Sequence, residues 1–431
     1  MNTTLSPSKS LKKDPKGLLL SASVLVMICF ACLVGMTLIM PLELIADEVV
    51  HVLQVMLFLA GQYYLGPITT VPPGYHTILA SISAALDIRY LTGFRIIHSI
   101  LSLSAVGLAW WYWQLIRPSY PLLQSLQLLA TPLLWPFYWT MYADLTSAAI
   151  VITGLLLTQQ RKYGWAATIG LFSLCFRQHN VFWVVLNLVL ALEQEGFWGS
   201  LYKEFKNPLT KKWGLIRDLL INGFRSTGIF FVPLFAFVIF VLLNHGIAVG
   251  DRTNQTFGGL YPIQLFGFVL VLWILLLPLH IANLPKIIRL LLNKPVWIPV
   301  LAILLLVFLL TYTISHPHNF RSDYFLRNWF LYQLKDMLKY QLYAYLAIAW
   351  SLLSIAVTPF RLKTQYWLYP ISALALLPVW LIEQRYYIVP FILFMLFRVP
   401  QARGIEIVIL LWSILLSIPL TMGFTSMKFF L

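Results

Sequence analysis

Runs of about 20 apolar residues recur along almost the whole chain, and this pattern decides what the chain can fold into. A helix of that length crosses the ~30 Å hydrocarbon core of a bilayer. Hydrophobic residues make up 60% of the 431 residues and charged residues 10%, whereas soluble domains carry about 25% charged residues. A water-soluble fold cannot bury this much apolar surface. The sequence therefore predicts an all-α polytopic membrane protein.

The apolar runs predict a single multispan bundle over residues 1–431, with about 11 to 14 transmembrane helices. Thirteen candidate spans lie at 17–42, 92–116, 121–141, 144–159, 164–176, 179–192, 222–244, 261–284, 296–314, 340–358, 366–381, 386–398 and 404–423. The short runs near 164–192 and 366–398 suggest paired or broken helices. Residues 43–91 form an extended first external loop, with one short helix along the interface at about 46–60.

Basic residues indicate how the chain is oriented. The run at 17–42 follows several lysines but is longer than the apolar core of a signal peptide, so it is expected to be a retained span. With the N-terminus in the cytoplasm, the inner segments hold 20 of the 30 Lys and Arg residues, as the positive-inside rule requires. The net charge of +15 is then explained by orientation and attraction to anionic lipid, with no nucleic-acid partner.

No cofactor or metal is expected. Cys29, Cys32 and Cys175 all lie inside apolar runs, where they are expected to be small apolar fillers and not a redox pair or metal ligands. His316 and His318 have no third ligand at a fixed spacing. Nucleotide-binding loops and haem motifs are missing from the sequence, as is the internal repeat that marks many transporters.

The polar motifs fall on the outer face in this orientation. They are Asp47-Glu48, Ile68 to His76, Tyr142 to Asp144, Arg177 to Asn180, Gly250 to Thr256, His316 to Asp323 and Glu383 to Tyr387. Polar groups near the bilayer are costly, so their concentration on one face indicates chemistry or recognition there.

The first of these motifs offers a general base. On a helix, Glu48 and His51 share one face, and Asp47, His51 and Gln54 share an adjacent one. An acid at the membrane surface could take a proton from a hydroxyl while that oxygen attacks. The alternative is a helix start whose acids complement the helix dipole.

Two further segments suggest a binding cavity. Two prolines and Gly74 make Ile68 to His76 a rigid turn, which could direct Tyr75 and His76 to a polar cavity or simply lead back to the membrane. Four consecutive hydrogen-bonding residues, Arg177 to Asn180, suggest a site for sugar hydroxyls or phosphate. The alternative for them is a solvated turn.

Arginines in the later motifs suggest an anionic ligand. Arg252 could bind a phosphate oxygen through charge-assisted hydrogen bonds, and the same loop contains a glycosylation sequon at 254–256. Arg385 could meet an anionic leaving group or pair with Glu383, and Asp144 has a structural alternative. A phosphate-linked lipid donor would unite these features, with its tail in the bilayer, its phosphate at the arginines and its sugar in the cavity.

The chain reads DEVVHVLQ at 47–54 and ITTVPPG at 68–74, and both segments resemble the start of the eukaryotic dolichyl-phosphate-glucose-dependent alpha-1,2-glucosyltransferases. Similar segments follow in the same order at Tyr142 to Asp144, Phe176 to Asn180, Val249 to Arg252, Pro262 to Phe266, His316-Pro317 and Glu383 to Tyr386. The chain departs from the family pattern at Leu65 to Pro67 and at Asn319 to Tyr324.

The resemblance implies the fold of the GT-C class of membrane glycosyltransferases and an inverting transfer of sugar, glucose above all. It implies Asp47 as the base, with Glu48 as its neighbour and alternative, and Arg252 and Arg385 at the phosphate. The other residues expected at the substrates are His51, Gln54, Thr69, Thr70, Tyr75, His76, Asp144, Arg177, Gln178, Asn180, Asp251, His316, Glu383 and Tyr386.

The implied partners are a polyprenyl-phosphate sugar donor, a lipid-linked glycan acceptor and membrane lipid. The implied location is the endoplasmic reticulum membrane in a eukaryote, or the inner membrane in a prokaryote, with the active site on the lumenal or external face. Three alternatives stay open from the sequence: a transferase for mannose or another sugar, a lipid-sugar transporter or flippase, and a non-catalytic scaffold.

Overall fold

The computed structural model describes residues 26–430, except 27–28, 32, 41, 67, 117–118, 207–220, 222, 251–257, 321–323 and 336. Within these ranges the chain is helical and its only β-type pairings are two isolated bridges, so the all-α prediction is confirmed. The first expected span, 17–42, is described only in part, and the sequon at 254–256 lies outside the described residues.

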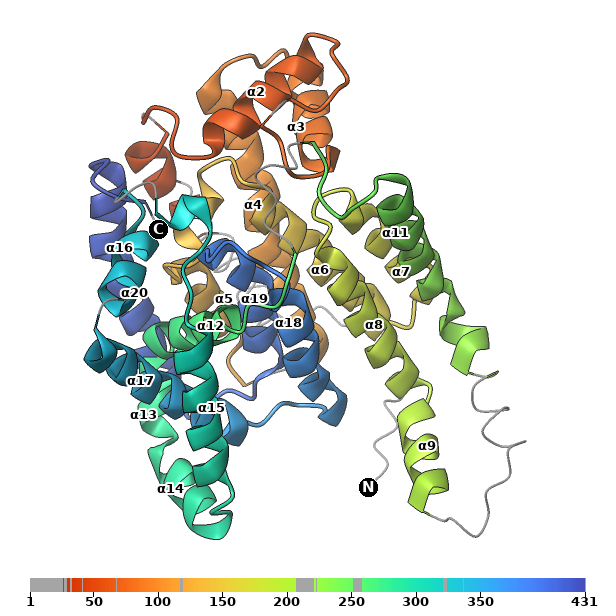
Figure 1. Ribbon diagram of the computed structural model, residues 1–431. Helices are drawn as coiled ribbons and strands as arrows, with labels where there is room; N and C mark the ends of the chain where they lie inside the picture. The colour runs from red at the N-terminus through yellow and green to blue at the C-terminus, as the bar shows by residue number, and fades with distance from the viewer. Residues whose placement is uncertain are drawn as a thin grey trace.

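The helices follow one another along the chain as Figure 1 shows. Their bounds are α2 (Glu48–Leu59), α3 (Gly74–Ala85), α4 (Leu91–Ile116), α5 (Pro121–Ala130), η1 (Trp135–Tyr138), α6 (Ala143–Gln159), α7 (Tyr163–Leu174), α8 (Asn180–Gln194), α9 (Phe197–Lys206), η3 (Gly228–Phe230), α11 (Phe231–Leu243), α12 (Ile263–Leu275), α13 (Leu277–Ala282), α14 (Leu284–Asn293), α15 (Trp297–Thr311), η4 (Pro317–Asn319), α16 (Leu326–Lys335), α17 (Leu338–Val357), η5 (Lys363–Trp367), α18 (Leu368–Leu376), η6 (Gln384–Tyr387), α19 (Ile388–Phe397) and α20 (Arg403–Thr425).

Four helices in the described part are long and apolar enough to cross a membrane by themselves: Leu91–Ile116, Gly223–Leu243, Leu338–Val357 and Arg403–Thr425. The pair α14 and α15 passes the same test together, although it is bent by 106°. Other expected spans are divided into shorter helices. Pro132 separates α5 from η1, because proline removes a helical hydrogen bond and clashes with the preceding turn.

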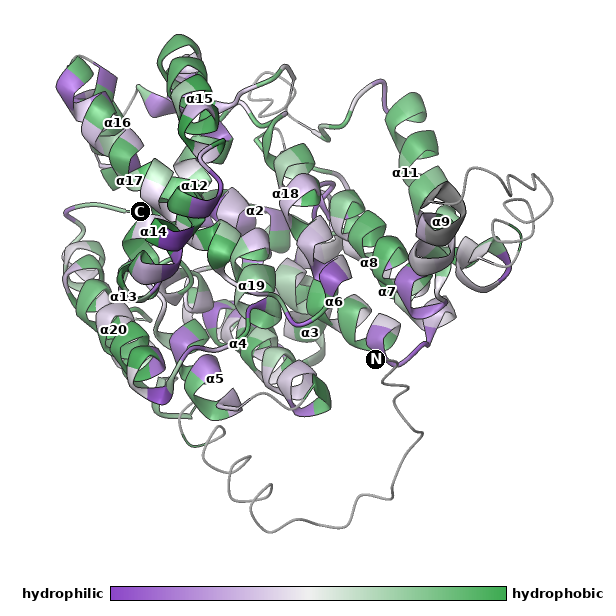
Figure 2. Cartoon of the chain, turned by 90° about the horizontal axis from the view of Figure 1, so that it is seen from below, coloured by the Kyte–Doolittle hydropathy of each residue, from purple (hydrophilic) through white to green (hydrophobic). Residues whose placement is uncertain are grey.

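The outer surface of the bundle is apolar, as Figure 2 shows along α11, α15 and α20. On α11, for example, Phe235 is 64% and Leu243 77% exposed. Soluble monomers rarely expose continuous apolar surface on this scale, whereas lipid-facing helices do. The apolar helices and this surface make the chain an integral membrane protein.

Helix α19 lies at the centre of the bundle. All its residues except Val389 are buried, and they join a core that includes Trp113, Trp139 and Leu155 from α4, η1 and α6. Because α19 is held on every side, it fixes the segments at its two ends. Glu383 to Tyr387 precede it and Arg398 follows it, which places two charged clusters about 15 Å apart along the helix.

Helices α2 and α3 pack together at one end of the bundle, at the top of Figure 1. Helix α2 matches the short helix expected at about 46–60. The expectation of a rigid turn through His76 is wrong beyond Pro73, because the prolines precede a helix and Gly74 begins it. The backbone N–H of Gly74 donates to the carbonyl of Cys175 at 2.8 Å, and a Cβ on Gly74 would lie 2.5 Å from that oxygen. Glycine therefore allows α3 to approach the chain between α7 and α8.

Two of the three cysteines, expected as small apolar fillers, lie in the described residues. Cys29 and Cys175 carry free thiols, and both are exposed at the surface of the bundle. Cys175 follows the last residue of α7, Leu174. Cys32 lies outside the described residues.

Candidate active site

Asp47 stands immediately before α2, at the end of the bundle that α2 and α3 cover. Its carboxylate lies 2.9 Å from the guanidinium of Arg385, and its backbone N–H donates to the hydroxyl of Tyr142 at 3.0 Å. The Asp47 side chain is nevertheless 45% exposed. A carboxylate that is held by Arg385, on a backbone held by Tyr142, and that is still open on one side is suited to accept a proton from a substrate.

Glu48 has a different environment, although it is the next residue. Its side chain is fully buried, and Arg95 contacts both of its oxygens at 3.0 and 2.5 Å. The backbone N–H groups of Ile45 and Met141 also donate to it, at 3.0 and 2.9 Å. The Glu48 carboxylate thus accepts four hydrogen bonds. The other N–H groups of Arg95 donate to backbone carbonyls between Ile39 and Glu43. This cluster joins the start of α2 to α4 and to the chain before α6.

Arg385 links Asp47 to Glu383. Its guanidinium lies 2.5 Å from the Glu383 carboxylate and 5.1 Å above the ring of Tyr142. Glu383 also pairs with Arg327 of α16 at 3.4 Å. Burial by itself would raise the pKa of Glu383, but Arg385 and Arg327 outweigh it and hold that pKa below its ordinary value. Glu383 is therefore ionised, and it keeps Arg385 in place beside Asp47.

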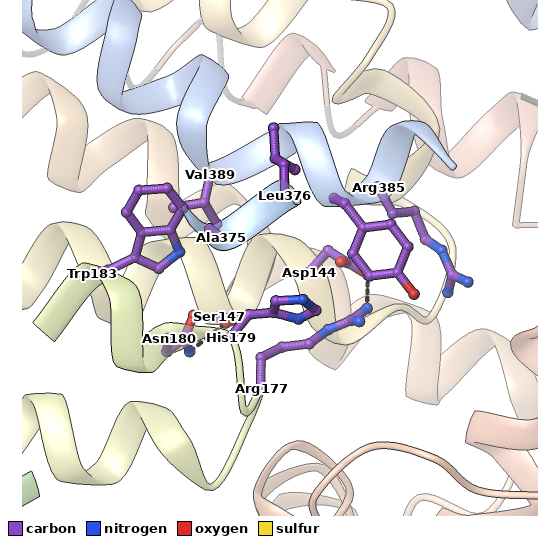
Figure 3. Close-up of a pocket in the computed structure, with 11 residues that line it drawn as sticks. Asp144, Ser147, Arg177, His179, Asn180, Trp183, Ala375, Leu376, Arg385 and Val389 are labelled. Carbon is purple, nitrogen blue, oxygen red and sulfur yellow. Dashed lines mark hydrogen bonds and ion pairs between the residues drawn. The ribbon is translucent and has the colours of Figure 1, made fainter. Parts of the chain in front are cut away.

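A second ion pair, between an arginine and a carboxylate, faces a small cavity beside Arg385. Arg177 binds the Asp144 carboxylate at 2.5 Å, as the dashed line in Figure 3 marks. The cavity has a volume of about 40 Å³ and is lined by Asp144, Ser147, Arg177, His179, Asn180, Trp183, Ala375, Leu376, Arg385, Tyr386 and Val389. The Nε groups of Arg177 and Arg385 are both buried without a hydrogen-bond partner. Unused N–H groups on two cations favour an anion.

Neighbouring residues hold this arrangement in place. The Asn180 amide donates to Ser147 at 2.8 Å and to the carbonyl of Ser173 at 2.7 Å. Gln178 reaches the carbonyl of Thr70 at 3.4 Å. The ring of Tyr386 lies 5.4 Å from that of His179. The segment 177–180 is therefore connected both to α6 and to the loop between α2 and α3.

A buried polar chain lies behind Asp47, between α2, α3 and α4. His51 and His76 share a hydrogen bond of 2.9 Å, and Tyr75 bonds to His98 at 2.9 Å. Burial lowers the pKa of His76 to about 3, and it lowers the pKa of His51 well below the ordinary value. Both rings are therefore neutral at physiological pH.

Gln54 and Thr69 shape the loop between α2 and α3. The Gln54 carbonyl oxygen accepts from the backbone of Gly66 at 2.7 Å and from the hydroxyl of Thr69 at 3.0 Å. Its amide donates to the carbonyl of Tyr64 at 2.9 Å. These bonds close the loop against α2.

Of the remaining expected site residues, His316 is described by the structure, whereas Asp251 and Arg252 are not. His316 is buried beside Trp380, with the ring centroids 4.6 Å apart, and the nearby Asn319 bonds to the backbone of Ile382 at 2.9 and 3.1 Å. Asp251 and Arg252 lie outside the described residues. Among the described residues, no group of three His, Cys, Asp or Glu side chains has the geometry to hold a metal ion.

The sequence reasoning did not select Arg95, Arg327 or Tyr142 as site residues. Arg95 had a usable signal, because it is a charged residue near the start of an apolar run of membrane-spanning length, and such residues are rarely without a partner. Tyr142 lies in the motif Tyr142 to Asp144, but its contact with Asp47 joins distant parts of the chain, and Arg327 has no sequence signal because its role depends on Glu383.

A larger cavity of about 480 Å³ begins next to Glu383 and is almost entirely apolar. Helices α12, α16 and α20 contribute side chains such as Phe266, Leu334 and Leu416 to its wall. Its polar residues include Arg327, Glu383 and Gln384. The cavity thus combines an apolar interior with a charged margin that belongs to the Asp47–Arg385–Glu383 network.

The comparisons with known proteins agree on one family. The model of the DIE2/ALG10 family matches residues 42–396. The chain is 26% identical to a Kluyveromyces lactis protein over 81% of this chain and 72% of that one. It is 23% identical to a Mus musculus and to a Homo sapiens protein, each over 81% of this chain and 83% of the relative. All three relatives are named Dol-P-Glc:Glc(2)Man(9)GlcNAc(2)-PP-Dol alpha-1,2-glucosyltransferase.

Among solved structures, ArnT from Cupriavidus metallidurans in the apo state aligns over 94% of this chain and 76% of its own length, at 14% identity. The TM-score is 0.37, which is too low to assign a shared fold. The family match spans both ends of the ion network and confirms the resemblance found in the sequence: the chain belongs to the DIE2/ALG10 family of glucosyltransferases.

Proposed function

We propose that this protein transfers glucose from a dolichyl-phosphate donor to a lipid-linked oligosaccharide in alpha-1,2 linkage, with Asp47 as the general base. The observation that supports this proposal most is the half-exposed carboxylate of Asp47. Arg385 holds that carboxylate, and Tyr142 holds the backbone N–H of Asp47. Beside them lies a cavity with two unused guanidinium N–H groups. The acceptor hydroxyl gives its proton to Asp47 while its oxygen attacks the anomeric carbon. The bond from that carbon to the phosphate oxygen breaks, and the electron pair leaves with the phosphate.

The environments of the two neighbouring acids decide between them as base. Glu48 is fully buried and already receives four donors, two of them from Arg95. To accept a substrate proton it would have to give up part of this cluster, and breaking a buried ion pair costs about 3–5 kcal/mol. Asp47 has free acceptor capacity toward the exposed side. We therefore assign the base to Asp47 and a positioning role to Glu48.

The departing phosphate needs cationic donors that stabilise its growing negative charge. Arg385 and Arg177 supply them, because each keeps a buried Nε–H without a partner at the same small cavity. Charge that grows on the leaving oxygen is stabilised most by donors that are already oriented. The carboxylates of Glu383 and Asp144 orient these guanidiniums at 2.5 Å each.

The apolar cavity suits the donor's lipid chain. It runs from α12 and α20 to Arg327 and Glu383, so an isoprenoid inside it would bring its phosphate toward the arginines of the network. The small polar cavity of about 40 Å³ is sized for a few waters in this state. Substrate entry therefore requires the surrounding side chains to move outward.

The bias of basic residues supports a lumenal position for Asp47, and the family relatives support the endoplasmic reticulum membrane. The same chemistry would also serve a transferase for mannose or another sugar. A transporter is less well supported, since it would need polar groups through the bilayer midplane, whereas this network lies at one end of α19.

The test is transfer by the purified protein from short-chain polyprenyl-phosphate glucose to lipid-linked glycan acceptors. Asp47→Asn is expected to lower kcat by at least about 100-fold with a similar donor KM, because loss of a general base removes about 10²–10⁴-fold in rate. Glu43→Gln is the matched control, since it removes an exposed carboxylate from the same loop.

Wild-type activity in Asp47→Asn would refute Asp47 as the base. Transfer of mannose but not of glucose by the wild type would refute the sugar while leaving the base assignment intact.

A further inference from the structure

The turn after α17 is held against the end of α19. Phe360 and Arg398 form an antiparallel bridge. The backbone N–H of Arg361 donates to the carbonyl of Phe397 at 3.2 Å, and that of Val399 donates to Pro359 at 2.9 Å. This pairing places Arg361 beside Arg398, at the end of α19 opposite Glu383 and Arg385.

Arg398 is satisfied within the protein. It is fully buried, and its guanidinium binds both oxygens of Glu406 at 2.7 and 2.6 Å. Gln127 accepts a further N–H at 2.9 Å. Glu406 therefore neutralises Arg398, and within the described residues it forms no ion pair with Arg361.

Arg361 has no such partner. Its Nε and Nη2 groups are buried without a hydrogen bond, and within the described ranges no carboxylate lies in salt-bridge distance of it. Burial lowers the pKa of Arg361, with Arg398 adding to the effect and Tyr112 opposing it. A half-buried guanidinium with unused donors is costly, and a bound phosphate would satisfy it through charge-assisted bonds.

The surroundings favour a lipid as the source of that phosphate. Exposed basic residues occur on both paired segments and on α14: Lys363 lies two residues after Arg361, Arg403 lies four residues after Val399 (which bonds to Pro359), and Lys286 of α14 reaches Gln401 at 3.5 Å. Helix α14 also exposes Ile288 at 55% and Leu292 at 77%. Figure 1 places α14 at the end of the bundle away from α2. Basic side chains beside exposed apolar ones are typical of a surface that contacts anionic lipid.

We propose that Arg361 binds the phosphate of an anionic lipid headgroup on the membrane face opposite Asp47. Its two unused N–H groups bind the phosphate oxygens, while Lys363 and Arg403 attract the headgroup. The site is separate from the transferase chemistry, so it stabilises the turn between α17 and α18 whether or not substrates are bound.

The experiment measures the melting temperature of the full-length protein in phosphatidylcholine micelles as phosphatidylglycerol is added. The wild type is expected to gain stability with a saturable dependence on the anionic lipid. Arg361→Gln should need at least about tenfold more phosphatidylglycerol for half of the effect, since tenfold corresponds to about 1.4 kcal/mol of binding. Arg361→Lys keeps the positive charge but loses the planar guanidinium, so the phosphatidylglycerol that it needs for half of the effect should lie between the values for the wild type and Arg361→Gln.

The matched control is Arg161→Gln, which removes an exposed arginine from another basic loop where Glu195 lies 4.0 Å away. It should respond to phosphatidylglycerol as the wild type does. An equal loss in both glutamine variants would overturn the site, because it would indicate general surface charge. Equal stabilisation of the wild type by inorganic phosphate in pure phosphatidylcholine would overturn the lipid as the source. A wild type with no response would overturn the proposal entirely.

Discussion

Tyr142 shows how one side chain organises both halves of the candidate site. Its hydroxyl accepts the backbone N–H of Asp47, and its ring lies beneath the guanidinium of Arg385. Phe430 stacks on the same ring, with centroids 5.9 Å apart and planes at 13°. Tyr142 thus sets the position of the proposed base through one contact and that of the phosphate-binding arginine through another. We regard it as a positioning residue.

Tyr142→Phe separates these two contacts. The hydroxyl is lost and the ring remains, so kcat is expected to fall about three- to tenfold, which corresponds to the ~1 kcal/mol of a lost hydrogen bond. The donor KM should change little, because the ring still supports Arg385. Tyr142→Leu removes both contacts and should also raise the donor KM. Steady-state kinetics with varied donor measure the split.

The control for this pair is Tyr138→Phe, which removes a buried hydroxyl that bonds only weakly to the carbonyl of Leu128 at 3.4 Å. An unchanged kcat in Tyr142→Phe would show that Asp47 does not depend on this hydroxyl for its position.

At this scale the sequence selected residues that the structure brings together, but it did not predict their contacts. Asp47, Arg177, Glu383 and Arg385 stand out because charged groups next to apolar runs need a reason. The different environments of Asp47 and Glu48 could not be predicted, because they depend on Arg95, which lies 47 residues beyond Glu48. Adjacent residues on a helix point in different directions, and only the packed structure shows which side each one faces.

Among the elements, α3 matters most for the site because it touches the segment that carries Arg177. Its first residue, Gly74, donates to Cys175, two residues before Arg177. Helix α2 packs against α3 and begins directly after Asp47. The close contact at Gly74 therefore links the segment with the proposed base to the segment with the second arginine.

Gly74→Ala is expected to weaken this link. The new Cβ would lie 2.5 Å from the Cys175 carbonyl oxygen, so α3 must move away, at a cost of about 1–3 kcal/mol for overpacking. We expect a lower melting temperature and a raised donor KM, because the Arg177 segment loses its support. Thermal unfolding and donor titrations give the two readouts.

Gly164→Ala is the comparison, since a Cβ there meets no atom within 4 Å, and alanine favours the helix more than glycine does. A Gly74→Ala protein as stable and active as Gly164→Ala would mean that α3 adjusts without disturbing the site.

The elements themselves were partly predictable. Long apolar runs predicted α4, α17, α20 and the apolar helix Gly223–Leu243, which includes α11, close to their observed limits, because length and apolarity alone specify such helices. Helix α3 was missed, because Pro72 and Pro73 read equally well as a turn and as the lead into a helix. The division of 121–141 and 261–284 into shorter helices follows from prolines whose effect depends on packing.

For the molecule as a whole, the orientation is the main untested consequence of the charge pattern. Single cysteines on a background without Cys29, Cys32 and Cys175 test it with a membrane-impermeant maleimide. In sealed microsomes, Tyr202→Cys on α9 should react from outside, and Tyr63→Cys beside α2 should react only after the vesicles are opened. Both parent side chains are well exposed, at 67% and 84%. The reverse pattern would invert the orientation and remove Asp47 from the lumenal side.

The membrane class and the family were predictable from the sequence because they rest on composition and on ordered motifs. The sequence did not predict which of these motifs contact one another in the folded protein. Asp47 near the start of the chain meets Arg385 near its end, and Glu383 meets Arg327 of α16. No periodicity in a single sequence specifies such contacts, because they depend on how the helices are arranged around α19.

The ion network at the Asp47 end consists of three carboxylates and three guanidiniums. Its members are Asp47, Asp144, Glu383, Arg177, Arg327 and Arg385. The formal charges cancel, so losing any one member leaves a partner uncompensated where water is scarce. Substitutions in this network should therefore be tolerated better when an acid and its arginine partner change together than when one of them changes alone. Asp47, Arg177 and Arg385 are fixed by their proposed roles in the reaction, so the coupled change should appear at Glu383 and its partner Arg327, which should vary across the family as a pair.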